Sequence, residues 1–286
     1  MGSPLRIVTT ADRIGEAWAV VVGRVSAVER DLTRFDARSA LSRLNQAAGS
    51  GEWVEVSPGV RRALAFAYRG YRTTGGRFDP RIIGALEALG DRAGVPLPSS
   101  PTVLRPRERW LDVDRADGHV RLASPVDLGG VAKGLALADA ACALEQSGIG
   151  TYLLEAGGEV IVSGRPPGHD AWRVAVEHPD RDLPAAVVGL AHGALATSSI
   201  RIRQWPGPAG TVLHHLLDPA TGQPARGIRS VTVHAADPGW AEIWSTAAFV
   251  AGTRVGDVLD GRAGWWTDEA GVMRMTAAAG PMVLWR

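Results

Sequence analysis

The spacing of apolar residues changes partway along the chain, and this change limits the folds available to it. Near the start, Trp18, Val21, Val25, Val28 and Leu32 recur every three or four residues, which is the pattern of one helix face. After about residue 150, the apolar residues form short runs separated by glycine, proline or aspartate, which is typical of strands and turns. Helices and strands do not alternate regularly, so the sequence predicts an α+β fold and not a doubly wound sheet.

The same patterns place the individual elements. Further helices are predicted from an apolar face or a glycine stop, over residues 60–74, from Gly134 to about Ser147, and over 241–250. Strands are predicted over residues 152–155, 160–163, 172–177, 186–191, 213–217, 230–235, 264–267 and 283–285. A hairpin is expected over 113–122 around Ala116-Asp117-Gly118, and a loop rich in proline and glycine over 91–107.

Length and composition set wider bounds. A chain of 286 residues suits one domain, 1–286, which could contain two intimately packed subdomains. A net charge of +1 without a block of basic residues argues against nucleic-acid binding. No apolar run reaches the roughly 18–20 residues of a membrane span, and no signal peptide or lipid-anchor cysteine is visible, so we expect a cytoplasmic protein. The single cysteine, Cys142, excludes an internal disulfide and is expected to be a small buried side chain.

The segment from Asp127 to Gly134 contains the only lysine, Lys133, in a chain whose other basic residues are arginines. A strand end, two glycines and a helix start would offer backbone N–H groups to a phosphate. Lys133 would then lie in the first helical turn and direct its charge at the same anion. An ordinary strand-to-helix turn explains the segment equally well.

Four other segments could contribute chemistry, and each has a simpler interpretation. Gly157-Gly158 could allow close approach of a ligand or form a hairpin turn, and the small hydroxyl residues in 195–199 could bind phosphate or cap a turn. His214 and His215 would face opposite sides of a strand, so both could not readily bind one metal. Glu242 and Thr246, four residues apart on a helix, could hold Mg²⁺, or Glu242 could stabilise the start of its own helix.

In this order the segments resemble the ApbE family, the FAD:protein FMN transferases, from about Thr33 to Thr246. The matching patterns are S-x-L-S-R-L-N at 39–45, G-G-x-F-D-P at 75–80, D-L-G-x-x-A-K-G at 127–134, G-G at 157–158, A-T-S at 196–198 and H-x-x-D-P-x-T-G-x-P at 215–224. The resemblance implies T-fold-like mixed sheets with flanking helices and a flavin site between two halves. It also implies an enzyme that moves FMN from FAD onto a threonine or serine of a partner protein and releases AMP.

The resemblance further implies roles for particular residues. FAD would be bound by Phe35, Leu89, Gly90, Asp91, Asp127, Lys133, His215 and Leu216. Mg²⁺ would be held by the carbonyl of Gly130 together with Glu242 and Thr246. The catalytic groups would be Lys133, His215 and Glu242, and either His215 or Glu242 could be the base for the acceptor hydroxyl.

Three positions depart from the family pattern. Glu242 stands where the family has aspartate, Ala138 stands where an aspartate follows the lysine, and no early strand is recognisable in residues 4–10. Two alternative functions follow from the same site. The protein could split FAD into FMN and AMP with water, or it could bind FAD without turnover.

Overall fold

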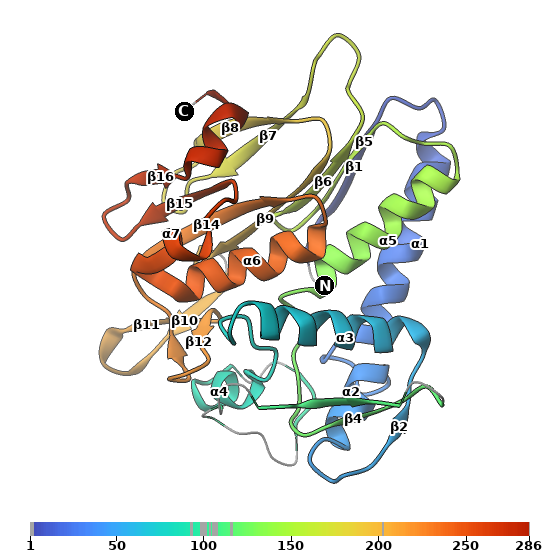
Figure 1. Ribbon diagram of the computed structural model, residues 1–286, viewed down its shortest axis with the longest axis vertical. Helices are drawn as coiled ribbons and strands as arrows, with labels where there is room; N and C mark the ends of the chain where they lie inside the picture. Colours follow the sequence, from blue (N-terminus) through green and yellow to red (C-terminus); the bar gives the residue numbers. More distant parts are fainter. Residues whose placement is uncertain are drawn as a thin grey trace.

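The computed structural model describes residues 3–91, 94–97, 102, 104, 108–114, 117–201 and 203–285 (Figure 1). Its helices are α1 (Ile14–Leu32), α2 (Ala40–Gln46), α3 (Pro58–Thr73), α4 (Ile83–Ala88), α5 (Ala132–Gln146), α6 (Pro238–Ala251) and α7 (Val255–Val258), with 3-10 turns over Pro208–Gly210, Gly252–Arg254 and Ala277–Met282. None of the helices in the described part of the chain is long and apolar enough to cross a membrane.

In the described residues the strands form five sheets, and all of their pairings are antiparallel. The largest has the order β1 (Leu5–Thr9), β5 (Tyr152–Ala156), β6 (Glu159–Ser163), β9 (Gly193–Ser199), β14 (Ile228–Ala235), β15 (Gly264–Asp268) and β16 (Met273–Met275). Two three-stranded sheets have the orders β17 (Val283–Trp285), β8 (Pro184–Leu190), β7 (Trp172–Glu177) and β2 (Val54–Glu55), β4 (His119–Leu122), β3 (Leu111–Val113). Two pairs complete the set, β10 (Gln204–Pro206) with β11 (Val212–His214) and β12 (Leu217–Asp218) with β13 (Gln223–Pro224).

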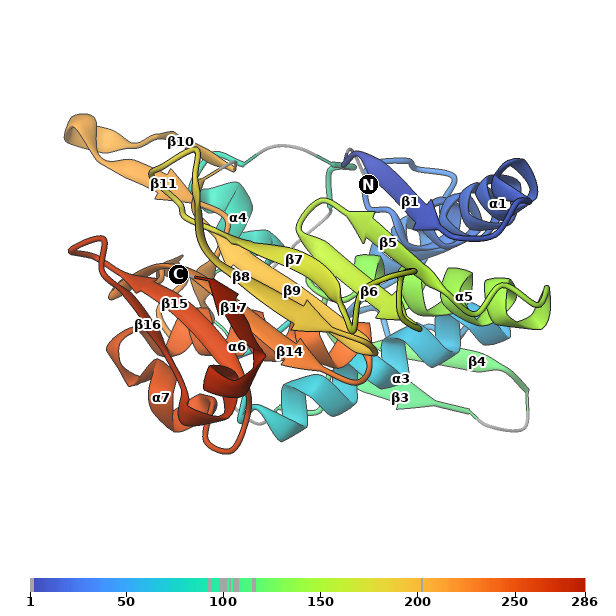
Figure 2. The same cartoon turned by 90° about the horizontal axis from the view of Figure 1, so that it is seen from above.

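The seven-stranded sheet is covered on both faces, and its side chains alternate accordingly. Leu154 and Ile161 pack with α1 and α5, whereas their neighbours Leu153 and Val162 pack with β7 and β8. This is the period of two expected for a strand, with apolar residues on each side. The helical layer contains α1, α5 and α6 side by side (Figures 1 and 2). Both α+β character and flanking helices therefore agree with the sequence-based prediction.

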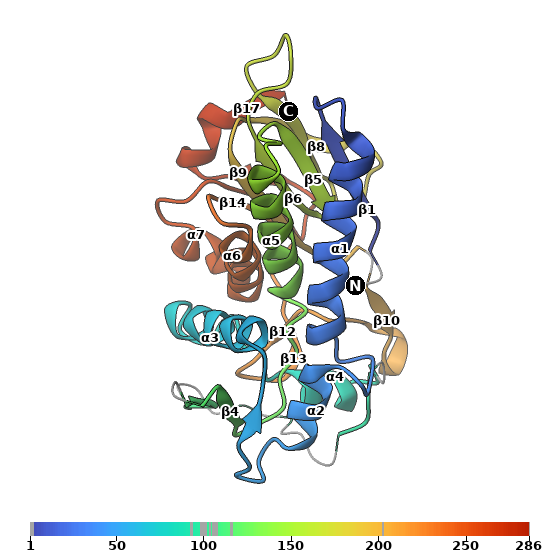
Figure 3. The same ribbon diagram turned by 90° about the vertical axis from the view of Figure 1, so that its right-hand side faces the viewer.

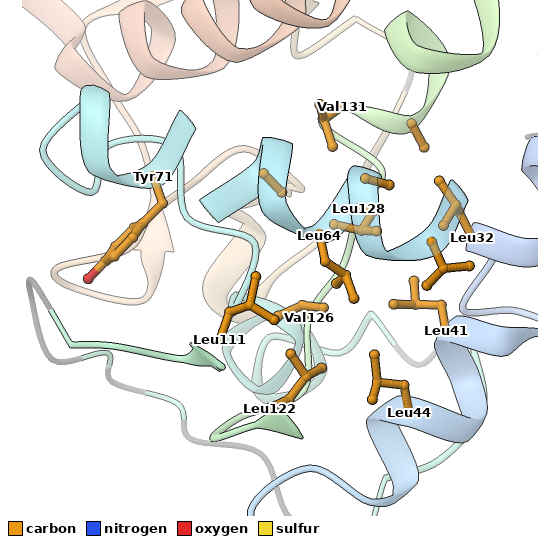
Figure 4. Packing of buried hydrophobic residues seen from close by; sticks show 14 of the residues in the cluster. Leu32, Leu41, Leu44, Leu64, Tyr71, Leu111, Leu122, Val126, Leu128 and Val131 are labelled. Atoms are coloured by element: carbon orange, nitrogen blue, oxygen red, sulfur yellow. The ribbon is translucent and has the colours of Figure 1, made fainter. Parts of the chain in front are cut away.

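A second hydrophobic core lies beyond the ends of these helices, around α2, α3 and the β2-β4-β3 sheet (Figures 3 and 4). Val126, Leu128 and Val131 insert into this core. They alternate with Asp127 and Gly129, which are thereby left facing away from it. The packing of three apolar side chains thus fixes the orientation of the segment that leads to Lys133. The division of 1–286 into one domain or two packed subdomains stays a prediction.

The side-chain amide of Asn45 makes the two backbone hydrogen bonds to Val126 that a neighbouring strand would otherwise make. Its Nδ2 donates to the Val126 carbonyl at 2.9 Å, and its Oδ1 accepts from the Val126 N–H at 2.9 Å. Both backbone groups of a buried residue are therefore satisfied without a sheet. Asn45 is buried at the end of α2, which is capped by Ser39 through a 2.9 Å hydrogen bond from the Ser42 N–H. This arrangement explains why the S-x-L-S-R-L-N pattern ends in asparagine.

Helices α5 and α6 meet at their N-termini because Gly134 on α5 allows close contact. A Cβ on Gly134 would lie 2.6 Å from the Pro238 carbonyl oxygen and 2.7 Å from the Gly239 nitrogen. Pro238 is the first residue of α6, and Asp237 caps that helix by accepting from the Trp240 N–H at 2.9 Å. The crossing brings the first turn of α5 against the first turns of α6.

Several sequence-based expectations are confirmed at the level of single turns. The helix after Gly134 ends before Gly148, which has a positive φ of 79°. Gly157 and Gly158 form the two-residue turn between β5 and β6, with φ of 58° and 97°. Positive φ at both positions is what a type I′ hairpin requires. The hairpin of β3 and β4 is also present, although its predicted tip at Ala116 and most of the predicted 91–107 loop lie outside the described residues.

Other expectations were wrong. Residues 4–10 do contain a strand, β1, which pairs with β5. Asp127 does not end a strand, because its neighbour Val126 bonds to the Asn45 side chain instead. The strand predicted over 213–217 is broken, since His214 ends β11 and Leu217 begins β12 in another pair of strands.

Two further corrections concern small residues. Residues 195–199 do not cap a turn, because they belong to the central strand β9, whereas their binding of phosphate stays a prediction. Their hydroxyls are used within the protein: Thr197 bonds to Thr232 at 2.8 Å, and Ser198 bonds to Ser245 at 3.0 Å. Cys142 is exposed, because it lies on the outer side of α5 while Ala141 and Ala143 are buried.

We predict that Gly134→Ala lowers stability, because a backbone contact at 2.6 Å can be relieved only by moving α6. The expected loss is about 2–3 kcal/mol, which is the range for overpacking. Gly23→Ala in α1 is the matched control. Its Cβ would meet nothing within 4 Å, so the better helix former should add about 0.5–1 kcal/mol. Urea unfolding of both variants measures the difference, and equal stability of the two would contradict this view of the helix crossing.

Candidate functional site

A buried ion pair lies where α5 and α6 cross. The Lys133 ammonium is 2.7 Å from Glu242 Oε1, and the backbone N–H of Gly134 donates to Glu242 Oε2 at 2.9 Å. Glu242 is only 2 % exposed and therefore needs these partners. α5 has no side-chain cap of its own, so a carboxylate from α6 serves the free N–H groups at its start. The anion at this helix N-terminus is thus supplied by the protein.

Lys133 has two further acceptors. Its ammonium is 3.3 Å from Glu159 Oε1 and donates to the Gly129 carbonyl at 3.2 Å. Burial by itself lowers the pKa of Lys133, but the charges of Glu242 and Glu159 outweigh burial and raise that pKa above its usual value. Lys133 is therefore charged throughout the physiological range. Glu159 was missed by the sequence analysis, although it directly follows the Gly157-Gly158 turn.

The three residues predicted to hold Mg²⁺ lie together. A Cβ on Gly130 would be 3.6 Å from Thr246 Oγ1, so the Gly130 backbone faces the Thr246 hydroxyl. Thr246 follows Glu242 by one helical turn on α6. Carboxylate, hydroxyl and carbonyl oxygens are the donors that Mg²⁺ prefers. In the described residues no three His, Cys, Asp or Glu side chains cluster as metal ligands, so a metal here would depend on this mixed set.

The charges around Lys133 fit an additional cation. Two buried carboxylates, those of Glu242 and Glu159, share one ammonium. Glu159 Oε2 is buried and has no hydrogen-bond partner among the residues that the structure describes. Burial raises the pKa of Glu159, and although Lys133 lowers it, the charge of Glu242 raises it further. The raised pKa means that the Glu159 carboxyl favours its protonated form, and a divalent ion nearby would favour the ionised form, so the residues present fit the predicted metal.

A second cluster of charges surrounds Arg34, which is 5 % exposed. Its Nε donates to Asp127 Oδ2 at 2.9 Å, and its Nη2 is 3.5 Å from Asp91 Oδ2. Asp91 also pairs with Arg203. Two predicted FAD ligands, Asp91 and Asp127, are thus joined by an arginine that the sequence analysis did not single out. Its position next to Phe35 was the available signal.

Gly129 links this second cluster to Lys133. Its N–H donates to Asp127 Oδ1 at 2.7 Å, and its carbonyl accepts from Lys133. The backbone of this one residue therefore connects the Arg34–Asp127 ion pair with the Lys133–Glu242 ion pair. Most of the predicted site residues fall into these two clusters or lie beside them.

Three predicted residues lie around the short β10–β11 hairpin. The carbonyl of Leu89 accepts from the Trp205 indole at 2.8 Å, and Gly90 has a φ of 94°. A Cβ on Gly90 would be 3.9 Å from the Trp205 indole nitrogen, so this segment runs along the Trp205 ring. His215 is held by the same hairpin, because its Nδ1 is 3.2 Å from the Arg203 carbonyl.

The hydrogen bond of His215 settles its tautomer. A carbonyl only accepts, so Nδ1 carries the hydrogen and Nε2 offers a lone pair. Burial, aided by the charge of Arg203, lowers the pKa of His215 to about 4. The imidazole is therefore neutral near pH 7. By contrast, His214 is turned toward Phe249, with ring centroids 5.8 Å apart, so the two histidines do face different surroundings.

The remaining two predicted residues differ in exposure. Phe35 is 57 % exposed, and the Arg34 guanidinium lies 4.7 Å from its ring centroid. Leu216 is buried in a cluster with Ile228 and Phe249, and its carbonyl accepts from the Ala225 N–H at 2.9 Å. Phe35 thus presents an aromatic face to solvent, whereas the Leu216 side chain belongs to the core.

The fold is α+β. At the crossing of the N-termini of α5 and α6, the buried Lys133–Glu242 ion pair is connected through Gly129 to the Arg34–Asp127 ion pair. A model of the ApbE family matches residues 1–262. The chain belongs to the ApbE family.

Named relatives agree with this assignment. The FAD:protein FMN transferase of Rhodobacter capsulatus is 32 % identical over 246 residues, covering 83 % of this chain and 47 % of that protein. The chain therefore spans about half of that relative. The FAD:protein FMN transferase of Haemophilus influenzae is 28 % identical over 262 residues, covering 86 % of this chain and 75 % of that protein.

Solved structures show the same fold. The ApbE protein of Thermotoga maritima is 27 % identical, with a TM-score of 0.87 over 98 % of this chain and 96 % of that one. The flavin transferase ApbE from Vibrio cholerae is 23 % identical, with a TM-score of 0.80 over 99 % and 96 % of the two chains. At 23 % identity, the likeness to the Vibrio cholerae protein shows a shared fold and nothing beyond it.

We predict that Arg34→Met destabilises the protein by about 3–5 kcal/mol, because it removes the buried guanidinium that pairs with Asp127 and lies near Asp91. Arg38→Met is the matched control. Its guanidinium is 89 % exposed and pairs only with Asp36, so we expect an unchanged melting temperature. Thermal unfolding followed by circular dichroism checks both variants. Equal melting temperatures would contradict a structural role for the Arg34 cluster.

Proposed function

We propose that this chain is an FAD:protein FMN transferase. The observation that carries the proposal is the Gly129 link, which joins the predicted flavin residues around Asp127 to the predicted phosphate and metal residues around Lys133. FAD contains both a flavin and a pyrophosphate, so a ligand of this kind needs both clusters at once. Two relatives of this chain, from Rhodobacter capsulatus and Haemophilus influenzae, are named FAD:protein FMN transferases, which supports the same activity.

The proposed reaction breaks the pyrophosphate of FAD. The hydroxyl oxygen of a threonine or serine on a partner protein forms a bond to the phosphorus of the FMN half. The bond from that phosphorus to the bridging oxygen breaks, and AMP leaves with the bridging oxygen. Catalysis of such a transfer depends mainly on positioning and on neutralising charge.

Lys133 would neutralise part of the pyrophosphate charge. Its side chain is 20 % exposed and lies in the first turn of α5, where a phosphate is expected. Gly130, Glu242 and Thr246 would hold Mg²⁺, which when bound supplies further positive charge for the leaving phosphate. Asp127 would act on the flavin side, where Arg34 fixes its carboxylate.

His215 is the better candidate for the base. Both oxygens of Glu242 already accept N–H donors, from Lys133 and from Gly134. His215 is neutral at pH 7 and has its Nε2 lone pair available. The acceptor hydroxyl would therefore pass its proton to Nε2 as its oxygen attacks.

An incubation with FAD and a threonine-bearing protein domain tests the function. We expect flavin fluorescence to migrate with the acceptor on a denaturing gel, AMP to appear in solution, and EDTA to abolish both. Free FMN with AMP and no labelled acceptor would indicate a hydrolase. FAD that stays bound and intact, with neither AMP nor a labelled acceptor, would indicate a binding protein, and the absence of FAD binding would refute the proposal.

We predict that His215→Asn slows transfer by about 10²-fold or more, the usual contribution of a general base, while FAD still binds. The control is His214→Asn, the neighbouring histidine turned toward Phe249. It should alter stability but change the transfer rate far less. Single-turnover rates at saturating FAD provide the measurement. A His215→Asn variant with the wild-type rate would rule out His215 as the base.

A further inference from the structure

Lys133 is the only ion-pair partner of either Glu159 or Glu242 in the part of the chain that the structure describes. Its ammonium has three hydrogens, and three acceptors surround it: Glu242 at 2.7 Å, Gly129 at 3.2 Å and Glu159 at 3.3 Å. A cation bound at Glu242 Oε1 would lie beside the Lys133 ammonium, and repulsion between the two positive charges favours moving the ammonium to another acceptor. The closest other carboxylate is that of Glu159.

Glu159 is suited to receive the displaced ammonium. It is 4 % exposed, and within the described part of the chain its Oε2 has no hydrogen-bond partner, although a buried carboxylate oxygen normally has one. Its backbone is fixed by the Gly157-Gly158 turn and by pairing with Ala196 in the central sheet. The unused oxygen is thus held rigidly beside the lysine, while the competing carboxylate sits on α6.

We propose that Glu159 is a positioning residue that takes over the Lys133 ammonium when Glu242 binds the divalent cation. Without Glu159, a bound cation would leave a buried lysine facing another positive charge. With Glu159, Lys133 changes its carboxylate partner and remains at the start of α5, where the pyrophosphate is expected. The inference rests on the metal site of the proposed function and adds a role for a residue outside it.

The wild-type protein offers a direct test because it has one lysine. A tag-free sample labelled with ¹⁵N and ¹³C in lysine gives a single side-chain signal. Without FAD, we expect this signal to shift as Mg²⁺ is added, with the same midpoint as Mg²⁺ binding measured by calorimetry. If Mg²⁺ binds but the chemical shift of the Lys133 signal does not change, the inference about Glu159 is overturned, while the proposed metal site still stands. A wild-type protein that binds no Mg²⁺ would refute the metal site itself, and with it the inference.

A double-mutant cycle distinguishes positioning from direct coordination. Mn²⁺ affinity, measured by electron paramagnetic resonance without FAD, should fall about tenfold or more in Glu159→Gln, because Lys133 then stays on Glu242. In Lys133→Met the competing ammonium is absent, so adding Glu159→Gln should change the affinity less than about twofold. Circular dichroism confirms that each variant is folded.

Two results of this cycle would overturn the inference. A wild-type Mn²⁺ affinity in Glu159→Gln would mean that Lys133 needs no second carboxylate. If Glu159→Gln lowers the Mn²⁺ affinity equally in the wild type and in Lys133→Met, Glu159 binds the metal itself. Transfer activity is measured separately, so an active enzyme with either result rejects the role of Glu159 and keeps the proposed function.

Discussion

The contact of Glu242 with Lys133 and Gly134 is the interaction on which the site depends. It brings a carboxylate from α6 to the uncapped start of α5, where the helix dipole and a free N–H favour negative charge. Burying two ions costs several kcal/mol each, so the pair persists only because its hydrogen bonds are satisfied. The glycine at 134 allows both the N–H contact and the close approach of α6. The packing of α5 against α6 and the pairing of Glu242 with Lys133 therefore depend on each other.

The Arg34 cluster extends this dependence toward the expected flavin side. Arg34 fixes Asp127, Asp127 accepts from Gly129, and the Gly129 carbonyl accepts from Lys133. The chain of contacts passes through both the N–H and the carbonyl of Gly129, so the two ends are joined through a single residue. A change at Arg34 would alter the position of Gly129 and thereby one of the three acceptors of Lys133. The two clusters are expected to respond together to a ligand that touches either.

Sequence reasoning recovered the elements whose signal is local. The α1 face, the stop at Gly148 and the Gly157-Gly158 turn depend on spacing or on positive φ, which neighbouring residues reveal. Sequence reasoning failed where the local structure depends on a partner that lies far away in the sequence. The Asn45 side chain replaces a strand beside Val126, and β9 is a strand because both its neighbours in the sheet pair with it. The roles of Arg34 and Glu159 were missed for the same reason, since their partners lie far along the chain.

The chemistry of the position explains why the only lysine of an arginine-rich chain is Lys133. Three acceptors from three elements surround its nitrogen, namely Glu242 on α6, Glu159 on β6 and the Gly129 carbonyl before α5. An ammonium presents three hydrogens from one compact atom and can exchange one acceptor for another by small rotations. A guanidinium is planar and larger, and its donors lie in a fixed fork. The position therefore requires a point charge that can change partners, and lysine provides it.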